Sequence, residues 1–368
     1  MNGPLLTAIG IAFNVWQGTG LGWLSLQKGL KISAVMNCLK SSSLVLGVLL
    51  AGCVGAESKP VGKRPAAKKS GALAFKSSLL DARKGFETKL VASREPRDKV
   101  PVAPARVFST VKYPSAVGNL AAYVTPDPRD GKKHPAIVWI TGGDCNSIGD
   151  VWSPRSAGND QSAAAFRKAG IVMMFPSLRG GNDNPGAKEG FLGEVDDVLA
   201  AAKWLEKQPY VDPKRIYLGG HSTGGTLALL VTEASPRFRA TFAFGPVDDV
   251  RGYGADSGFL PYDLSDKTES LVRSPGYWVD SVRTPTWIIE GGEQGNIESL
   301  RAIEAVAERL PSRSNLHFIE IQGATHFSDL APTNGLLAKK VVADTGAKCN
   351  ISLSEEEANR NFGGGTAG

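Results

Sequence analysis

The chain has 368 residues, of which 42% are hydrophobic, and this is enough for one large domain of roughly 250 residues with additional segments. Its net charge of +6 is unevenly distributed: residues 1–53 carry +3 and residues 54–100 carry +7, which leaves −4 for residues 101–368. Residues 101–368 are therefore slightly acidic. This argues against a nucleic-acid-binding domain, which needs a basic surface. The basic segment before these residues is either a tether near an anionic membrane surface or a solvated linker.

Residues 36–53, MNCLKSSSLVLGVLLAGC, have the order of features found in an export signal. Lys40 precedes an apolar run over residues 44–50 that is too short to span a bilayer comfortably. With the final Leu-Ala-Gly-Cys, the segment resembles a bacterial lipoprotein signal, which implies cleavage before Cys53 and lipidation of that cysteine. Because Val54 follows it, the resemblance also implies the outer membrane, facing the periplasm. An ordinary secretory signal or a membrane anchor is the alternative.

The segments on either side of the signal are assigned from composition. Residues 1–35 are apolar and glycine-rich, so we interpret them as an upstream extension or a misassigned start, with translation beginning at Met36. Residues 54–100 predict a basic linker that ends in a short helix from about residue 81. We expect the folded domain over residues 101–347 and a flexible tail over residues 348–368.

Strands and helices alternate through the domain. The apolar run AIVWIT at residues 136–141 is typical of a strand covered on both faces. Strands are predicted over residues 106–113, 120–124, 136–141, 170–176, 215–219, 238–244, 286–290 and 316–321. Helices are predicted over residues 161–169, 189–207, 223–233, 297–310 and 327–344. This alternation predicts an α/β fold with a mostly parallel sheet and helices on both faces. Residues 251–281 interrupt the pattern, and we expect them to form a small lid or insertion over the site.

One short motif carries the chemistry. Gly220, Ser222 and Gly224 form a G-x-S-x-G pattern between the predicted strand at 215–219 and the predicted helix at 223–233. A serine on a sharp strand-to-helix turn is the nucleophile elbow of the α/β-hydrolase fold, in which glycines permit the tight turn. We therefore interpret Ser222 as the nucleophile of a serine hydrolase.

A serine hydroxyl needs a base, and the chain has four histidines. His134 lies near a lysine-rich turn, His221 belongs to the elbow itself, and His317 lies inside a predicted strand. His326 follows the last predicted strand, where the order serine, acid, histidine places the base. His326 is therefore the predicted base; a helix-capping histidine is the alternative interpretation.

The third triad member has several candidates. Related hydrolases usually place an aspartate in the loop after the strand TWIIE, and this loop, Glu290 to Asn296, has none. Glu293 is nearest the expected position, although Gln294 holds the strict spacing. Glu290 at the strand end is the second candidate, and Asp248 or Asp249 after the preceding strand is the third. Any of them could orient the imidazole.

The oxyanion of an acyl-transfer intermediate needs two backbone amides. The amide of Thr223 at the predicted helix start is one candidate, and Gly143, in the glycine pair after AIVWIT, is the other. Cys145 and Cys349 are the cysteines left for the folded body, and a bridge between them stays open. The sequence contains no CxxC motif and no Cys/His cluster that would indicate a metal site. The predicted chemistry needs no cofactor.

Two further stretches carry a family resemblance. Pro176 to Asn182, PSLRGGN, and Gly193 to Val198, GEVDDV, together with the elbow and the loop GATHF, resemble landmarks of the prolyl oligopeptidase family over about residues 115–345. The resemblance implies a serine peptidase catalytic domain, without the family's N-terminal β-propeller and with its usual acid replaced. Arg179 and Asp196 are equally well explained by an ion pair that fixes the loop to the helix.

These features predict a lipid-anchored serine peptidase of the cell envelope that acts on a small peptide or ester through an acyl-enzyme. A carboxylesterase with the same residues is the first alternative, because fold and triad do not fix the leaving group. The second alternative is a non-catalytic binding lipoprotein on a decayed hydrolase fold, which the missing aspartate suggests. No nucleic-acid partner is expected.

Overall fold

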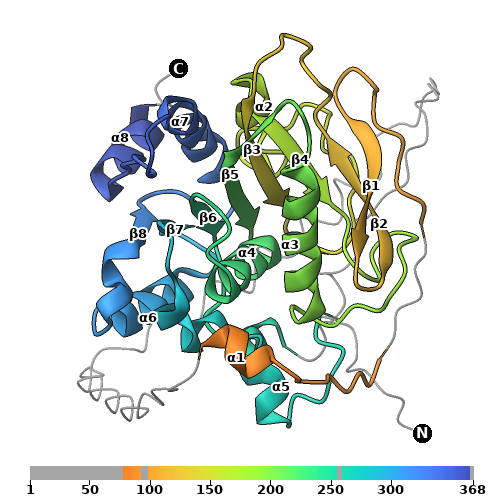
Figure 1. Cartoon of the computed structure of the whole chain (residues 1–368). Coiled ribbons are helices and arrows are strands. Elements are labelled where there is room, and N and C mark those ends of the chain that lie inside the picture. The colour runs from red at the N-terminus through yellow and green to blue at the C-terminus, as the bar shows by residue number, and fades with distance from the viewer. Residues whose placement is uncertain (1–77, 93–97, 255–258, 365–368) are drawn as a thin grey trace, which may run out of the picture. The chain divides into compact units, whose positions relative to one another are not determined.

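The computed structural model describes residues 78–92, 98–254 and 259–364 (Figure 1). All of them belong to the second of the chain's two compact units, Gly71–Gly368. The expected extension over residues 1–35 and the expected lipoprotein signal over residues 36–53 lie outside the described residues. Within the described ranges, no helix has the length and apolar character needed to cross a bilayer.

One eight-stranded sheet forms the centre of the domain. Its strands are β1 (Ser109–Ser115), β2 (Gly118–Val124), β3 (His134–Ile140), β4 (Val172–Pro176), β5 (Val211–His221), β6 (Thr241–Phe244), β7 (Thr286–Gly291) and β8 (Leu316–Ile321). They lie in the order β1-β2-β4-β3-β5-β6-β7-β8. β2 pairs antiparallel with β1 and β4, whereas the strands from β4 to β8 are parallel. The mostly parallel sheet predicted from the sequence is confirmed.

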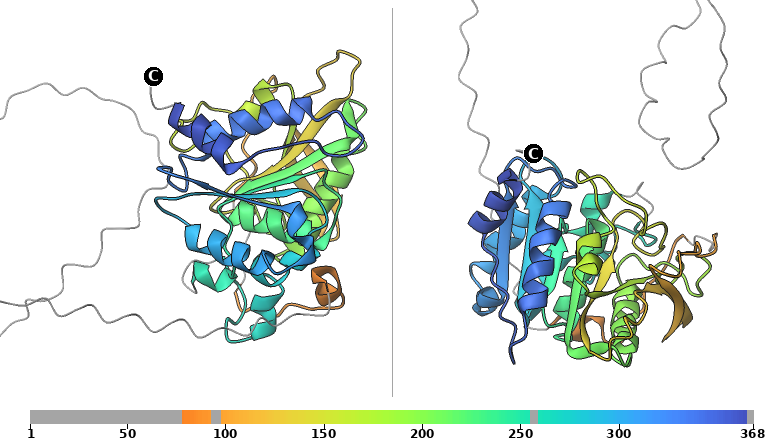
Figure 2. Two further views of the ribbon diagram at one scale, coloured as in Figure 1. Left: turned by 90° about the vertical axis from the view of Figure 1, so that its left-hand side faces the viewer. Right: turned by 90° about the horizontal axis from the view of Figure 1, so that it is seen from above.

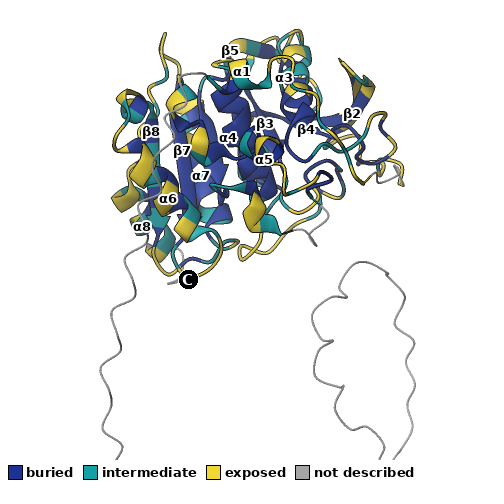
Figure 3. Ribbon diagram, turned by 90° about the horizontal axis from the view of Figure 1, so that it is seen from below, coloured by how far each residue is buried: buried dark blue, intermediate teal, exposed yellow. Residues whose placement is uncertain are grey.

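Helices cover both faces of this sheet (Figure 2). They are α1 (Leu79–Arg83), α2 (Ala164–Lys168), α3 (Gly193–Leu205), α4 (Thr223–Ala234), α5 (Lys267–Leu271), α6 (Ile297–Ala307), α7 (Leu330–Ala343) and α8 (Glu355–Gly364). One apolar cluster joins the sheet to α3 and α4, and another joins it to α2 and α7. Because side chains alternate along a strand, β3 gives Val138 to the first cluster and Trp139 to the second. The sheet is therefore buried between its helices, whose outer sides are exposed (Figure 3).

The end of the chain differs from the expected flexible tail. Residues 355–364 form α8, and Leu353 and Ala358 are buried in the cluster that also contains α7. The indole nitrogen of Trp287 in β7 donates to the carbonyl oxygen of Leu353 at 3.1 Å. These few apolar contacts are not periodic in the sequence, so no pattern predicted them.

The described residues of the insertion between β6 and β7 contain α5 and the 3₁₀ helices Val250–Tyr253, Pro275–Tyr277 and Val279–Ser281. The segment 78–92 links it to the body: Leu90 forms a bridge with Tyr262, the Lys89 amide donates to a Glu269 carboxylate oxygen at 2.7 Å, and Arg83 pairs with Asp196 of α3. Glu269 in turn forms a buried ion pair with Arg273. The insertion is therefore held on the domain by residues that precede the first strand.

The expected ion pair between Arg179 and Asp196 is not formed. Arg179 pairs with Asp197, with a nitrogen–oxygen distance of 2.9 Å, and with Glu189, whereas Asp196 pairs with Arg83. Successive residues on a helix point about 100° apart, so Asp197 faces the loop and is fully buried while Asp196 is 56% exposed. An ion pair does join this loop to α3, but its aspartate is Asp197 and not Asp196.

The two cysteines of the domain do not form a bridge. Cys145 and Cys349 are both free, and they belong to the clusters on opposite faces of the sheet. Burial raises the pKa of the Cys145 thiol well above its usual value. Cys145 is therefore a buried neutral thiol.

Candidate active site

Ser222 occupies a strained turn between β5 and α4. β5 ends at His221, α4 begins at Thr223, and Ser222 between them has φ 57° and ψ −119°. Such a backbone is unfavourable for a residue with a side chain, and it persists only where the surroundings impose it. A Cβ on Gly220 would lie 2.3 Å from the carbonyl oxygen of Gly224, so the glycines permit the turn. The geometry is that of a nucleophile elbow.

The two residues predicted to bind the oxyanion are in contact. The Thr223 hydroxyl donates to the carbonyl oxygen of Gly143 at 2.8 Å, and Gly143 has φ 75°, which favours glycine. The Gly142 amide is occupied, because it donates to the Gln161 side chain at 2.8 Å. Among the described residues, the Thr223 and Gly143 amides have no acceptor. These two amides are therefore free to bind a substrate oxygen.

His326 contacts a buried carboxylate. Its Nδ1 lies 2.8 Å from Oε2 of Glu290, which is fully buried, while the His326 side chain is 12% exposed. The Glu290 carboxylate also accepts hydrogen bonds from the amides of Gly291 and Asn296, both at 2.8 Å. A carboxylate can only accept, so Nδ1 of His326 carries a proton, and in the neutral imidazole the lone pair is then on Nε2. This is the tautomer that a general base needs.

The carboxylate in contact with His326 belongs to Glu290 and not to Glu293, the first candidate from the sequence. Glu293 was the first choice, but it is exposed, and its amide donates to the backbone oxygen of Ala324 at 3.0 Å. Asp248 instead accepts from the Ser299 hydroxyl at 2.7 Å. Glu290 is the residue before the last in β7 and pairs in register with Glu320 of β8, the strand that leads to His326. The strand pairing therefore brings the second sequence candidate to the imidazole.

His221 places the His326 loop against the elbow. Its Nε2 donates to the backbone oxygen of His326 at 2.8 Å, and the two rings lie 4.5 Å apart. Burial, and then the charge that His326 can carry, lower the pKa of His221 to about 3, so it stays neutral. In the described part of the chain, no hydrogen bond joins Ser222 Oγ to His326; such bonds often form only when substrate binds. His134 and His317 instead contact Asp130 and Trp287.

Gly245, after β6, leaves room for the imidazole. A Cβ at this position would lie 2.4 Å from Cε1 of His326 and 2.8 Å from Oε2 of Glu290, and the φ of 56° favours glycine. We expect Gly245→Ala to lower kcat by about 100-fold or more, because small displacements of catalytic groups have effects of this size. Gly335→Ala is the matched control, since no atom lies within 4 Å of its added Cβ. Steady-state kinetics measure the turnover of both variants. Equal turnover would contradict the view that Gly245 leaves room for a catalytic imidazole.

An aromatic cluster from two separate parts of the chain, the loop before α3 and the insertion, lies next to the elbow. The Tyr253 hydroxyl is 2.7 Å from the Thr226 hydroxyl, which donates to the backbone oxygen of Ser222 at 3.2 Å. Phe191 and Phe259 each lie 5.6 Å from the Tyr253 ring, measured between centroids. The insertion was expected near the site from the sequence, but these residues were missed because no local pattern links them.

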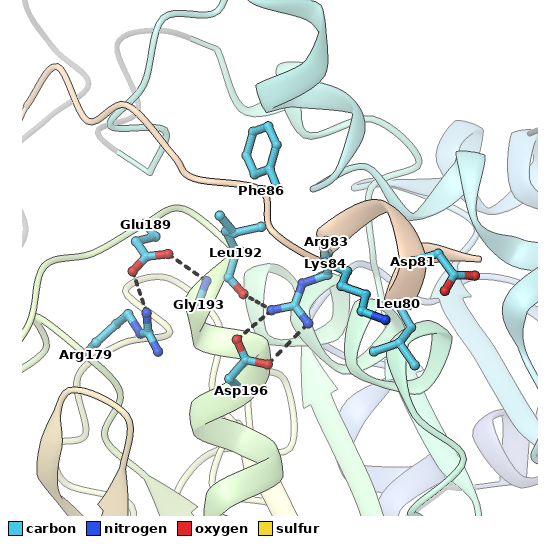
Figure 4. Close-up of a pocket in the computed structure, with 10 residues that line it drawn as sticks. All are labelled: Leu80, Asp81, Arg83, Lys84, Phe86, Arg179, Glu189, Leu192, Gly193 and Asp196. Carbon is cyan, nitrogen blue, oxygen red and sulfur yellow. Dashed lines mark hydrogen bonds and ion pairs between the residues drawn. The ribbon is translucent and has the colours of Figure 1, made fainter. Parts of the chain in front are cut away.

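The described residues also contain a cavity of about 410 Å³ between α1 and the start of α3 (Figure 4). Arg83 in this cavity is bound to the Leu192 carbonyl oxygen and to Asp196, and Glu189 is bound to Arg179 and the Gly193 amide. Four of the six charged side chains that line it are thus paired with each other, and the lining does not include the serine, histidine and glutamate described above. Within the described ranges, no three His, Cys, Asp or Glu side chains gather as metal ligands would.

Comparisons with known sequences agree with this geometry. Residues 158–278 match the model of the prolyl oligopeptidase family. The chain is 32% identical over 212 residues to dipeptidyl-peptidase 5 of Porphyromonas gingivalis and 29% identical over 157 residues to a probable dipeptidyl-aminopeptidase B of Talaromyces marneffei. These matches cover 51% and 41% of this chain but 30% and 17% of the relatives, so the chain spans less than a third of the length of either.

Solved structures agree on the fold. The acylaminoacyl peptidase of Pyrococcus horikoshii has a TM-score of 0.55 at 15% identity, covering 68% of this chain and 44% of its own. The 2,6-dihydroxy-pseudo-oxynicotine hydrolase has a TM-score of 0.52 at 14% identity, covering 68% and 72%. The α/β-hydrolase fold predicted from the sequence is confirmed. Part of this chain is also similar in sequence to the prolyl oligopeptidase family and to two relatives named as peptidases.

Proposed function

We propose that this chain is a serine peptidase of the prolyl oligopeptidase type in which Ser222, His326 and Glu290 form the catalytic triad. The observation that carries the proposal is the strained turn at Ser222 beside an imidazole that a buried carboxylate holds in its basic tautomer. Strain of this kind destabilises the fold, and it is found mainly where function requires it. That combination also favours an active enzyme over a decayed binding lipoprotein.

Acylation follows from the positions of these groups. Ser222 Oγ attacks the substrate carbonyl carbon while Nε2 of His326 takes its proton, and Glu290 stabilises the imidazolium through Nδ1. The Thr223 and Gly143 amides donate to the oxygen that becomes negative. His326 then gives its proton to the leaving nitrogen as the bond to the carbonyl carbon breaks. Water, activated by the same imidazole, releases the acyl group from Ser222.

The acyl side of the substrate is proposed to be apolar. The half-buried Tyr253 and Phe259 offer aromatic surface near the turn that carries Ser222, and the buried Phe191 packs behind Tyr253. The peptidase relatives support peptide substrates, and a small apolar residue before the scissile bond fits such a surface.

The substrate class is tested by comparing amides with esters of one acyl group. A peptidase hydrolyses peptide amides, such as aminoacyl p-nitroanilides, with a kcat/KM that approaches that of the corresponding p-nitrophenyl ester. A carboxylesterase turns over the ester and leaves the amide intact. The second result would replace the peptidase assignment with the esterase alternative and leave the triad untouched.

We also propose that the enzyme is anchored in the cell envelope, at the outer membrane facing the periplasm, through a lipid on Cys53. The order of Lys40, the apolar run and Cys53 supports this. Metabolic labelling with a radioactive fatty acid in a bacterial host is expected to mark the full chain but not the Cys53→Ala variant. Equal labelling of both chains, or none of either, would remove the anchor from the account.

A further inference from the structure

Phe327 follows the proposed base directly in the sequence. Its large apolar side chain lies beside the His326 imidazole, and the proposed triad gives it no role. The residue is 40% exposed, and its ring lies 5.0 Å from the His326 ring, nearly perpendicular to it. Its centroid is also 5.3 Å from that of the buried His221 ring. One side of the ring is therefore packed on the two histidines, and the rest faces solvent.

The loop holds this ring in place. The Thr325 amide donates to the Ser328 hydroxyl at 2.9 Å, and the Ser328 amide donates to the Thr325 hydroxyl at 3.2 Å. This reciprocal pair closes the loop around His326 and Phe327. Because the turn is already formed, a ligand that packs on Phe327 has little loop entropy to overcome.

The direction of proton transfer indicates which part of a substrate meets this ring. Glu290 occupies Nδ1, so Nε2 of His326 must give its proton to the leaving nitrogen, at about 3 Å. The residue that follows the scissile bond therefore starts next to the imidazole. The Phe327 ring is the imidazole's neighbour, so a large side chain on that residue can reach it.

We infer that Phe327 is a specificity-determining residue for the leaving group and that it favours an aromatic or large aliphatic residue after the scissile bond. The inference rests on the proposed triad. A side chain of this kind buries its own apolar surface and the exposed part of the Phe327 ring together. Glycine at that position gains neither contact.

Acyl transfer to added amines measures the preference for the residue after the scissile bond. It does not require knowledge of which acyl group the enzyme prefers. p-Nitrophenyl acetate acylates Ser222 and releases p-nitrophenolate. Phenylalaninamide or glycinamide then competes with water: its nitrogen bonds to the acyl carbon, the bond to Ser222 Oγ breaks, and His326 passes the amine proton to Oγ. The amine occupies the place of the leaving group, so the ratio of the two N-acetyl products at equal amine concentrations reports its contacts.

The wild-type ratio should favour phenylalaninamide by about tenfold, the scale of one packed aromatic contact. Phe327→Ala should bring the ratio near one, Phe327→Leu should give an intermediate value, and Val342→Ala, another exposed apolar residue, should leave it at the wild-type value. If Phe327 only positioned His326, both captures would fall together and the ratio would not change. That result, or a wild-type ratio near one, would overturn the inference alone. A wild-type chain that releases no p-nitrophenolate would overturn the proposed function and the inference with it.

Discussion

Replacing Glu290 with glutamine should lower kcat by about 10⁴-fold, the effect known for removing the charge of a triad acid without changing its shape. Both Glu290 oxygens accept from donors, Oε1 from the Gly291 amide and Oε2 from Asn296 and His326. A glutamine must turn its NH₂ group toward one of these donors. If it faces His326, it forces the proton to Nε2 and removes the base.

Glu293→Gln is the matched control, since it makes the same chemical change in the same loop at an exposed position. Its turnover should stay close to that of the wild type, as expected for a surface substitution. Steady-state kinetics of the two purified variants, with circular dichroism to show that both are folded, decide between the carboxylates. A large loss in Glu293→Gln with little change in Glu290→Gln would return the acid to the residue first predicted.

The strained turn gives a second expected result, in which activity and stability move in opposite directions. Ser222→Gly should abolish turnover and raise the free energy of unfolding, whereas Ser222→Ala should abolish turnover without that gain. A residue with a side chain at φ 57° and ψ −119° costs of order 1–3 kcal/mol, and glycine adopts this backbone without the penalty. Glycine also gives the unfolded chain more conformational freedom, which lowers the free energy of unfolding by about 0.5–1 kcal/mol.

The difference between the two variants is therefore the quantity to measure. Urea unfolding should show Ser222→Gly more stable than Ser222→Ala by about 1 kcal/mol. Both variants lose the same hydroxyl, so the comparison isolates the backbone. An alanine variant as stable as the glycine variant would mean that the turn is relaxed, and it would remove strain from the case for an active enzyme.

Local patterns predicted the parts of the site that local sequence controls. The turn at Ser222 needs glycines at fixed positions on either side, and its flanking strand and helix are continuous apolar runs. The Thr223 amide is free because it starts the helix after this turn, and Gly143 belongs to the glycine pair that follows another apolar strand. His326 is the predicted base because four histidines leave few choices and the chain order of the fold selects one of them.

The acid could not be chosen in this way, because its position depends on strand pairing. The spacing typical of related enzymes favoured Glu293, but the register of β7 with β8 brings Glu290 to the imidazole. The same kind of reason applies to Tyr253, which meets Phe191 only after two segments far apart in the sequence have folded together. Asp196 and Asp197 are successive residues of α3 and point in different directions. The rotation of the helix therefore decides that Asp197 binds Arg179 of the preceding loop.

Labelling with a fluorophosphonate probe, followed by mass spectrometry of the modified peptide, tests the central claim most directly. The probe reacts with a serine only where a base activates it and an oxyanion site stabilises the adduct. We predict that the wild-type chain is labelled on Ser222 and that His326→Ala is not labelled, although its serine is intact. No label on the folded wild-type chain, or a label on another residue, would contradict the assignment of Ser222 as the nucleophile.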